Sequence, residues 1–142
     1  MYKNILLPVD LNELSSSGKI LSNAVQYCRS FDAQLHIMSV VPDFGMAVVG
    51  SFFPDDYGKQ AVEQAKEALE EFASKAKEQG VDVETHAGYG NIYEEILTMS
   101  KAINADLIII AASRPDLKDF LLGPNAARVV RHAKCSVLVV RQ

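Results

Sequence analysis

The sequence predicts an α/β fold, in which a doubly wound, Rossmann-like sheet of five parallel strands is covered by helices on both faces. Short, largely apolar runs alternate along the chain with longer amphipathic segments. Strands that alternate with helices form parallel sheets, and burial on both faces explains why most of these runs lack polar alternation. Because 142 residues suit one domain with one core, we expect a single domain over residues 1–142.

The runs expected to form strands are residues 4–9, 33–41, 81–87, 106–112 and 136–140. The segments expected to form helices are residues 15–31, 59–79, 92–103 and 123–133. Right-handed crossovers would connect the strands and place helices on both faces of the sheet.

The first three elements follow from periodicity and from residues that begin or end structure. The run NILLPV at residues 4–9 is compact and apolar, and Pro8 is placed at its end because proline cannot donate to a strand ladder. The next segment starts with serine caps and repeats apolar residues at helical spacing between Ile20 and Cys28. Pro42 closes the second strand.

Residues 43–58 mix glycine, proline, aromatic and acidic residues without a clear period. A loop of this length in a compact domain is typical of a lid or a binding loop, so we expect a flexible flap over a bound ligand. In the helix that follows, the apolar residues between Val62 and Ala76 share one face, and Gly80 ends it.

The second half of the chain repeats the alternation. Residues 81–87 alternate in polarity, which predicts a more exposed strand, and GYGN then supplies a turn before the helix that carries Ile92 and Ile103. The run DLIIIAA is the clearest strand signal in the chain. GPNAARVVRHA predicts a short helix, and SVLVV predicts the last strand.

Composition and charge exclude several classes of protein. Apolar residues make up 49% and charged residues 23% of the chain, as in ordinary globular proteins. A net charge of −4 argues against a nucleic-acid binder, which needs clustered basic residues. No segment reads as a signal peptide or a membrane span. Cys28 and Cys135 are far apart without a partner motif, so we expect a cytoplasmic protein with free thiols.

Ligands of such sheets bind beyond the carboxyl ends of the strands, where the strand order reverses. Asp10 follows the first strand, and its carboxylate would accept from a ribose hydroxyl or an adenine amino group, or would cap a turn. Ala111 ends the fourth strand, and its small side chain would let a ligand approach the backbone. Beyond it, Arg114 would either pair with a phosphate or be solvated.

The segment GPN suits the start of a helix that binds phosphate. Free N–H groups and the positive end of the helix dipole favour an anion there. Gly123 permits close approach, while Asn125 would either cap the helix or bond to a ribose or phosphate oxygen. Equally, GPN would simply begin a helix that binds nothing.

Catalytic and metal-binding patterns are scarce. His36, His86 and His132 fall in a strand, at a strand end and in a helix, without metal-ligand spacing. His36 is assigned to a satisfied position in the core or its flank. Neither cysteine has a base nearby in sequence, and no nucleophile motif occurs. We therefore predict no catalytic residue and no metal ligand.

Three segments together resemble the universal stress protein family, specifically its short F/G-type bacterial members. They are NILLPVD, GNIYEEIL and the long ending LIIIAASRPDLKDFLLGPNAARVVRHAKCSVLVV. The resemblance covers essentially the whole chain and is weakest at residues 43–58. It implies the strand order 3-2-1-4-5 and ATP bound between the ends of strands one and four, with or without Mg²⁺.

The family's nucleotide motif is G-x-x-G, nine residues, then G-[ST]. Here Ala111 and Arg114 stand at the first two glycine positions, the spacer is one residue shorter, Gly123 is retained and Pro124 replaces the final hydroxyl residue. The resemblance implies a nucleotide site that is formed by Pro8, Val9, Asp10, Val40, Val41, Gly90, Ala111, Ser113, Arg114, Gly123, Pro124 and Asn125.

These observations predict an ATP-binding regulatory module of the stress response. The alternatives are a slow ATP hydrolase or autophosphorylating protein, and a structural dimer without nucleotide. A flavodoxin-like electron carrier would need a phosphate loop directly after strand one, where DLNELSSSG offers only scattered hydroxyls. The apolar run Val137 to Val140 at the end of the chain would form a bare sheet edge, which predicts a homodimer through that strand.

Overall fold

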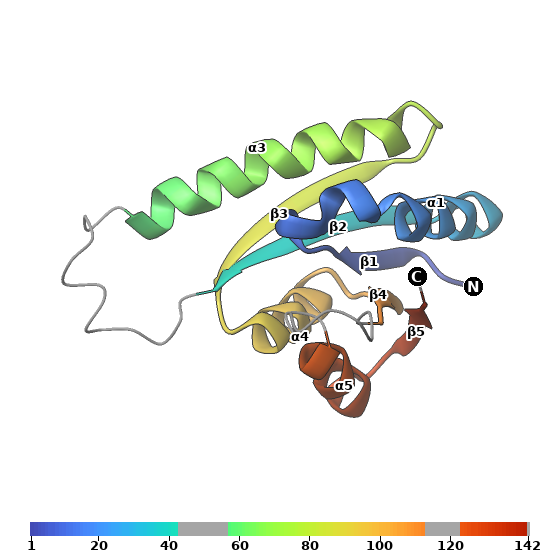
Figure 1. The fold of residues 1–142 in the computed structure, drawn as a ribbon. Coiled ribbons are helices and arrows are strands. Elements are labelled where there is room, and N and C mark those ends of the chain that lie inside the picture. The colour runs from blue at the N-terminus through green and yellow to red at the C-terminus, as the bar shows by residue number, and fades with distance from the viewer. Residues whose placement is uncertain (43–56, 113–122, 142) are drawn as a thin grey trace.

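The computed structural model, which describes residues 1–42, 57–112 and 123–141, contains one five-stranded parallel sheet between two layers of helices (Figure 1). The strand order is β3-β2-β1-β4-β5, as predicted. The strands are β1 (Asn4–Pro8), β2 (Gln34–Pro42), β3 (Val83–Gly90), β4 (Leu107–Ala111) and β5 (Ser136–Val140). Each pairs in parallel with its neighbours.

The helices divide between the two faces of the sheet. They are the 3₁₀ helix η1 (Leu11–Ser16), α1 (Gly18–Phe31), α3 (Tyr57–Lys77), α4 (Ile92–Ala102) and α5 (Gly123–His132). In Figure 1, α1 and α3 cover one face, and α4 and α5 cover the other.

Two apolar clusters, one on each face, hold these layers together. Side chains of a strand alternate between faces, so Ile5 and Leu7 pack with α1 and α3, while Leu6 packs with α4 and α5. All three are fully buried. Each such side chain contributes roughly 1.5–3 kcal/mol to folding, so the central strand anchors both layers.

Helix ends follow from local chemistry. Asp32, in the left-handed conformation at φ 54°, ends α1, and its N–H donates to the Cys28 carbonyl oxygen. Asn91 caps α4, where its side-chain oxygen accepts from the Glu94 N–H at 3.3 Å. These caps fix where the chain turns back toward the sheet.

Several predicted boundaries were wrong by one to three residues. The strand predicted at residues 81–87 continues to Gly90, because Val40, Val41 and Pro42 pair with Gly88, Tyr89 and Gly90. The loop predicted at residues 43–58 ends earlier, since α3 begins at Tyr57; residues 43–56, on which the flap prediction falls, lie outside the described residues. The first strand ends at Pro8 rather than Val9.

No helix in the described part of the chain combines the length and the apolarity needed to cross a membrane.

Candidate functional site at the carboxyl edge of the sheet

The strand order reverses between β1 and β4, and the helices that follow these two strands lie on opposite faces of the sheet. α1 follows β1 on one face, whereas α5 follows β4 on the other. The chain therefore leaves the two strands toward opposite faces, and sheets of this kind bind ligands beyond the strand ends at such a reversal. Leu6 of β1 is paired with Ile108 of β4. Val9 and Ala111 are each three residues further along, so they lie side by side at the carboxyl edge of the sheet.

Asp10 stands at the end of β1 and caps η1. Its Oδ1 accepts from the Asn12 N–H at 2.9 Å. The cap interpretation of this residue is thus confirmed. The Asp10 carboxylate also stands at the carboxyl edge of the sheet, next to Pro8 and Val9 in the chain. The Val9 N–H donates to the Met38 carbonyl oxygen at 2.8 Å, which fixes Val9 against β2.

The ends of β2 and β3 extend this edge away from β1. Val40 and Val41 are half-buried near the end of β2, and Gly90 pairs with Pro42 at the end of β3. Gly90 adopts φ +141°, a conformation that favours glycine. Because neighbouring strands lie about 4.8 Å apart, Gly90 lies roughly 10 Å across the sheet from β1 and is the outermost of the predicted site residues.

α5 begins at Gly123, with Pro124 and Asn125 in its first turn, and carries no acidic residue there. The first N–H groups of a helix lack partners within the helix and favour an anion. Asn125 is the third residue of α5, and both of its predicted roles, as a helix cap or as a ligand contact, stay predictions. Ser113 and Arg114 lie outside the described residues, and their assignment to the phosphates stays a prediction.

A second group, of side chains with potential metal-ligand atoms, was missed by sequence reasoning. His36 on β2 and Glu84 and His86 on β3 bring their ligating atoms within 4.8 Å of one another. His36 Nδ1 and His86 Nε2 are 3.0 Å apart, at hydrogen-bonding distance. The Glu84–x–His86 spacing on one strand was a usable signal, because residues two apart share a face, but the third member depends on how β2 and β3 align.

The sequence predicts His36 to be a satisfied residue of the core or its flank; it lies in the core, but one of its ring nitrogens is not hydrogen-bonded within the described residues. It is buried, with 4% of its surface exposed, yet its Nε2 has no hydrogen-bond partner among the described residues. Burial and then the neighbouring His86 lower the pKa of His36, while Glu84 and Asp82 oppose this shift. Burial, together with a smaller effect of Lys66, lowers the pKa of His86 against the opposing charge of Glu84.

Comparison with known proteins agrees with this architecture. The family model described as the universal stress protein family matches residues 1–141. Universal stress protein G of Escherichia coli O157:H7 is 29% identical over 143 residues, which cover 99% of this chain and all of the relative. The structure of universal stress protein UspA from Lactobacillus plantarum superposes with a TM-score of 0.80 at 24% identity, covering 99% of this chain and 98% of that chain.

Two further solved structures contain nucleotides. A universal stress protein from Archaeoglobus fulgidus was solved in complex with dAMP; it is 19% identical with a TM-score of 0.68, and 97% of each chain is covered. Another universal stress protein, in complex with cAMP, is 20% identical with a TM-score of 0.69, and 99% of this chain and 97% of that chain are covered. At identities of 19–24%, the structural likeness shows the fold alone. The family model matches nearly the whole sequence and therefore shows the family. The chain therefore belongs to the universal stress protein family.

Proposed function

We propose that this protein binds ATP at the carboxyl edge of the sheet, between the ends of β1 and β4, and acts as a cytoplasmic regulatory module of the stress response. The observation that carries the proposal is the reversal of strand order between β1 and β4, with α5 beginning in the connection that follows β4. Adenine nucleotides bound to two proteins of the same fold support this choice of ligand.

The composition of the site favours binding over turnover. Among the predicted site residues in the described part of the chain, Asp10 alone has an ionisable side chain, and that carboxylate already caps η1. The other members offer apolar side chains, backbone groups and one amide. Such a set suits recognition of an adenine ring, a ribose and phosphates without proton transfer.

The Gly123→Asp variant tests the site. A carboxylate at the start of α5 is compatible with the helix dipole, so the protein should fold, but it would repel phosphate. We expect ATP affinity measured by calorimetry to fall at least tenfold. Gly123→Asn is the matched control, because it adds a side chain of nearly the same size at the same position of α5 without the negative charge.

ATP affinity that is unchanged in Gly123→Asp would contradict the site, and equal losses in both variants would place the phosphates elsewhere. Native mass spectrometry of the purified wild-type protein identifies the bound nucleotide directly. If that protein neither retains nor binds an adenine nucleotide, the proposed function is wrong.

We further infer that two copies pair through β5. Within the described residues, β4 is the one strand that pairs with β5, so the other side of β5 is a sheet edge. Its residues are apolar apart from Ser136, and Val139 is 41% exposed. An apolar edge strand offers unpaired N–H and carbonyl groups to a second copy.

A further inference from the structure

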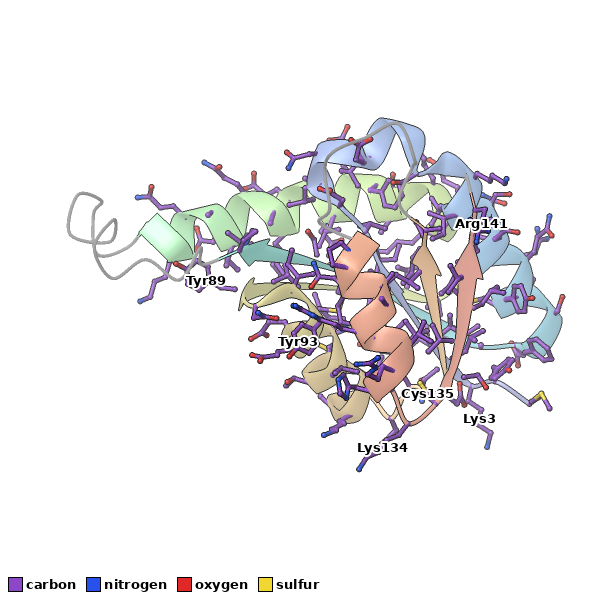
Figure 2. All side chains as sticks on the ribbon, turned by 60° about the horizontal axis from the view of Figure 1, so that its bottom comes forward. Lys3, Tyr89, Tyr93, Lys134, Cys135 and Arg141 are labelled. Atoms are coloured by element: carbon purple, nitrogen blue, oxygen red, sulfur yellow. The ribbon has the colours of Figure 1, made fainter. Side chains whose placement is uncertain are left out.

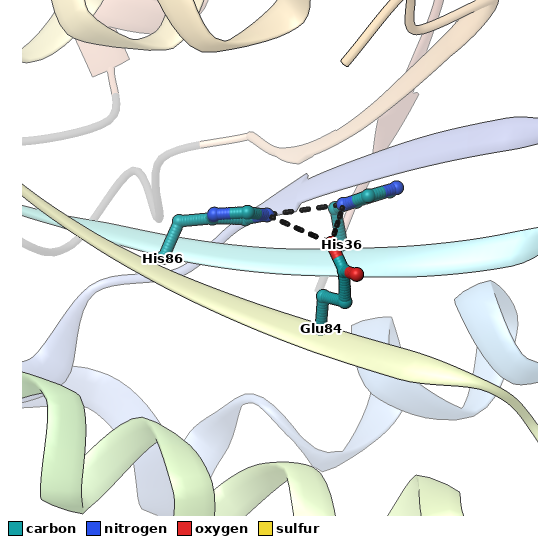
Figure 3. Close-up of side chains that lie close together, drawn as sticks. All are labelled: His36, Glu84 and His86. Atoms are coloured by element: carbon teal, nitrogen blue, oxygen red, sulfur yellow. Dashed lines mark hydrogen bonds and ion pairs between the residues drawn. The ribbon is translucent and has the colours of Figure 1, made fainter. Parts of the chain in front are cut away.

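His36, Glu84 and His86 converge in the first half of β2 and β3 (Figure 3). The nucleotide is proposed to bind at the opposite, carboxyl ends of the strands. Glu84 Oε2 is 3.5 Å from His36 Nδ1 and 3.9 Å from His86 Nε2. The two histidine nitrogens are 3.0 Å apart. Three potential ligand atoms therefore surround one point.

These separations match a tetrahedral metal site. Zinc lies about 2.0–2.1 Å from histidine nitrogens and about 2.0–2.2 Å from carboxylate oxygens, which separates neighbouring ligand atoms by roughly 3.3–3.5 Å. Of the three separations in this cluster, 3.5 Å lies at the upper end of that range, 3.0 Å lies below it and 3.9 Å lies above it. An ion fits with side-chain shifts of a few tenths of an ångström.

The backbone of the sheet holds the three side chains in this arrangement. His36 is directly opposite Glu84 in the register of β2 and β3, and Glu84 and His86 are two residues apart on one face of β3. Thr85, between them, donates to Glu70 of α3 on the other face. The cluster thus lies on the face away from α3, as Figure 3 also shows.

Structural packing alone explains the histidine pair poorly. The hydrogen bond between the rings leaves His36 Nε2 buried without a partner among the described residues, and such a group lowers stability. A histidine that ligates a metal through Nδ1 carries its proton on Nε2, so one tautomer is fixed. The half-exposed Glu84 leaves one side of the cluster open to solvent.

We propose that His36 Nδ1, Glu84 Oε2 and His86 Nε2 bind one divalent transition-metal ion, with Zn²⁺ as the best match, and leave a fourth position to water. Two imidazoles and one carboxylate are a known zinc ligand set with an open position. The nitrogen donors disfavour Mg²⁺, which prefers oxygen. His36 precedes Val40 by four residues, or roughly 13 Å along the strand, so this site is separate from the proposed ATP site.

Metal titration of the tag-free protein, after removal of metals with a chelator, tests the proposal. We expect one equivalent of Zn²⁺ by calorimetry. We also expect Co²⁺ to give the intense visible absorption of a tetrahedral site, without the near-ultraviolet band of cobalt bound to thiolate. That second readout excludes Cys28 and Cys135 as the ligands.

Glu84→Gln and His86→Gln should each weaken Zn²⁺ binding at least tenfold and abolish the visible Co²⁺ spectrum. His132→Gln is the matched control, because it changes the exposed histidine of α5 in the same way and should leave both readouts intact. Glu84 is exposed, so its variant should fold and retain ATP binding even if His86→Gln does not fold. Stoichiometric binding that survives Glu84→Gln, or no binding to the wild-type protein, would overturn the proposal.

Discussion

The two thiols of this protein differ in their surroundings, and their chemistry should differ accordingly. Cys28 is buried in α1 against the core shared with α3, and burial raises the pKa of its thiol to about 12. Cys135, just before β5, is half-buried; burial also raises the pKa of its thiol, although a backbone hydrogen bond opposes the shift. Because the thiolate is the reactive form, both are weak nucleophiles, and Cys28 is also inaccessible.

We expect iodoacetamide at about pH 8 to modify Cys135 slowly in the folded protein and Cys28 only after unfolding. Peptide mass spectrometry of protein labelled with and without denaturant measures both sites. In the Cys135→Ser variant, the folded protein should take up almost no label. Equal labelling of the two cysteines in the folded wild-type protein would contradict the burial of Cys28.

Asp10 shows how one residue can serve the fold and the proposed site together. Its capping bond to the Asn12 N–H holds η1 in place, and η1 is the connection through which the chain leaves β1 for α1. Caps of this kind contribute about 1 kcal/mol. The carboxylate is therefore already oriented at the carboxyl edge before any ligand arrives, which reduces the entropy lost on binding.

At the scale of elements, the junction of β3 and α4 depends on two glycines that pack against one side chain. A Cβ added at Gly88 would lie 3.3 Å from Glu95 Oε2, and one added at Gly90 would lie 3.1 Å from Glu95 Oε1. Gly90 also has φ +141°, whereas Gly88 has no positive φ. Crowding by a flexible carboxylate is easily relieved, but backbone strain is not.

We expect Gly90→Ala to lower the free energy of unfolding by about 1–3 kcal/mol and Gly88→Ala to lower it by less. Urea denaturation of the two variants measures the difference. In a Glu95→Ala background, Gly88→Ala should become neutral or stabilising, while Gly90→Ala should keep most of its cost. If the Glu95→Ala change rescued both variants equally, crowding rather than backbone conformation would be the cause.

The elements of this fold could be predicted from the sequence because each strand and helix has its own periodicity and its own end signals. The end of β3 could not be predicted from the sequence, since Gly88 and Gly90 are typical turn residues. Only their pairing with β2 keeps them in the strand. The proposed carboxyl-edge site rests on the positions of Asp10 and Gly123 relative to the strands, and its residues stay a prediction. The cluster of His36, Glu84 and His86 could not be predicted from the sequence, because it depends on the register of β2 and β3. A slip of one residue in that register would turn His36 to the other face of the sheet.

At the scale of the whole molecule, the two edge strands of the sheet differ in the polarity of their residues. β3 forms one edge with the largely polar or small residues VETHAGYG, and it carries the histidine and glutamate cluster. β5 forms the other edge with SVLVV. Lys19 of α1 donates to the Arg141 carbonyl oxygen at 2.9 Å, which ties the end of β5 to α1. Figure 2 labels Arg141 at the end of β5. This edge is therefore held in place and presents an apolar strand.

The pairing of two copies through β5 predicts a specific response to charge. Val139→Lys would place an ammonium group at the centre of the interface, where burial without a partner is costly. We expect sedimentation velocity to show a wild-type dimer at micromolar concentration and a Val139→Lys protein shifted toward monomer. The ATP affinity of Val139→Lys should stay within about twofold of the wild type, because separate sites behave independently.

Val130→Lys is the matched control, since Val130 is 50% exposed on α5 rather than on the edge strand. Two antiparallel β5 strands related by a two-fold axis would satisfy each other's N–H and carbonyl groups, so the control should remain dimeric. Dissociation of both variants would move the interface to the α5 surface, and a monomeric wild-type protein would exclude the dimer altogether.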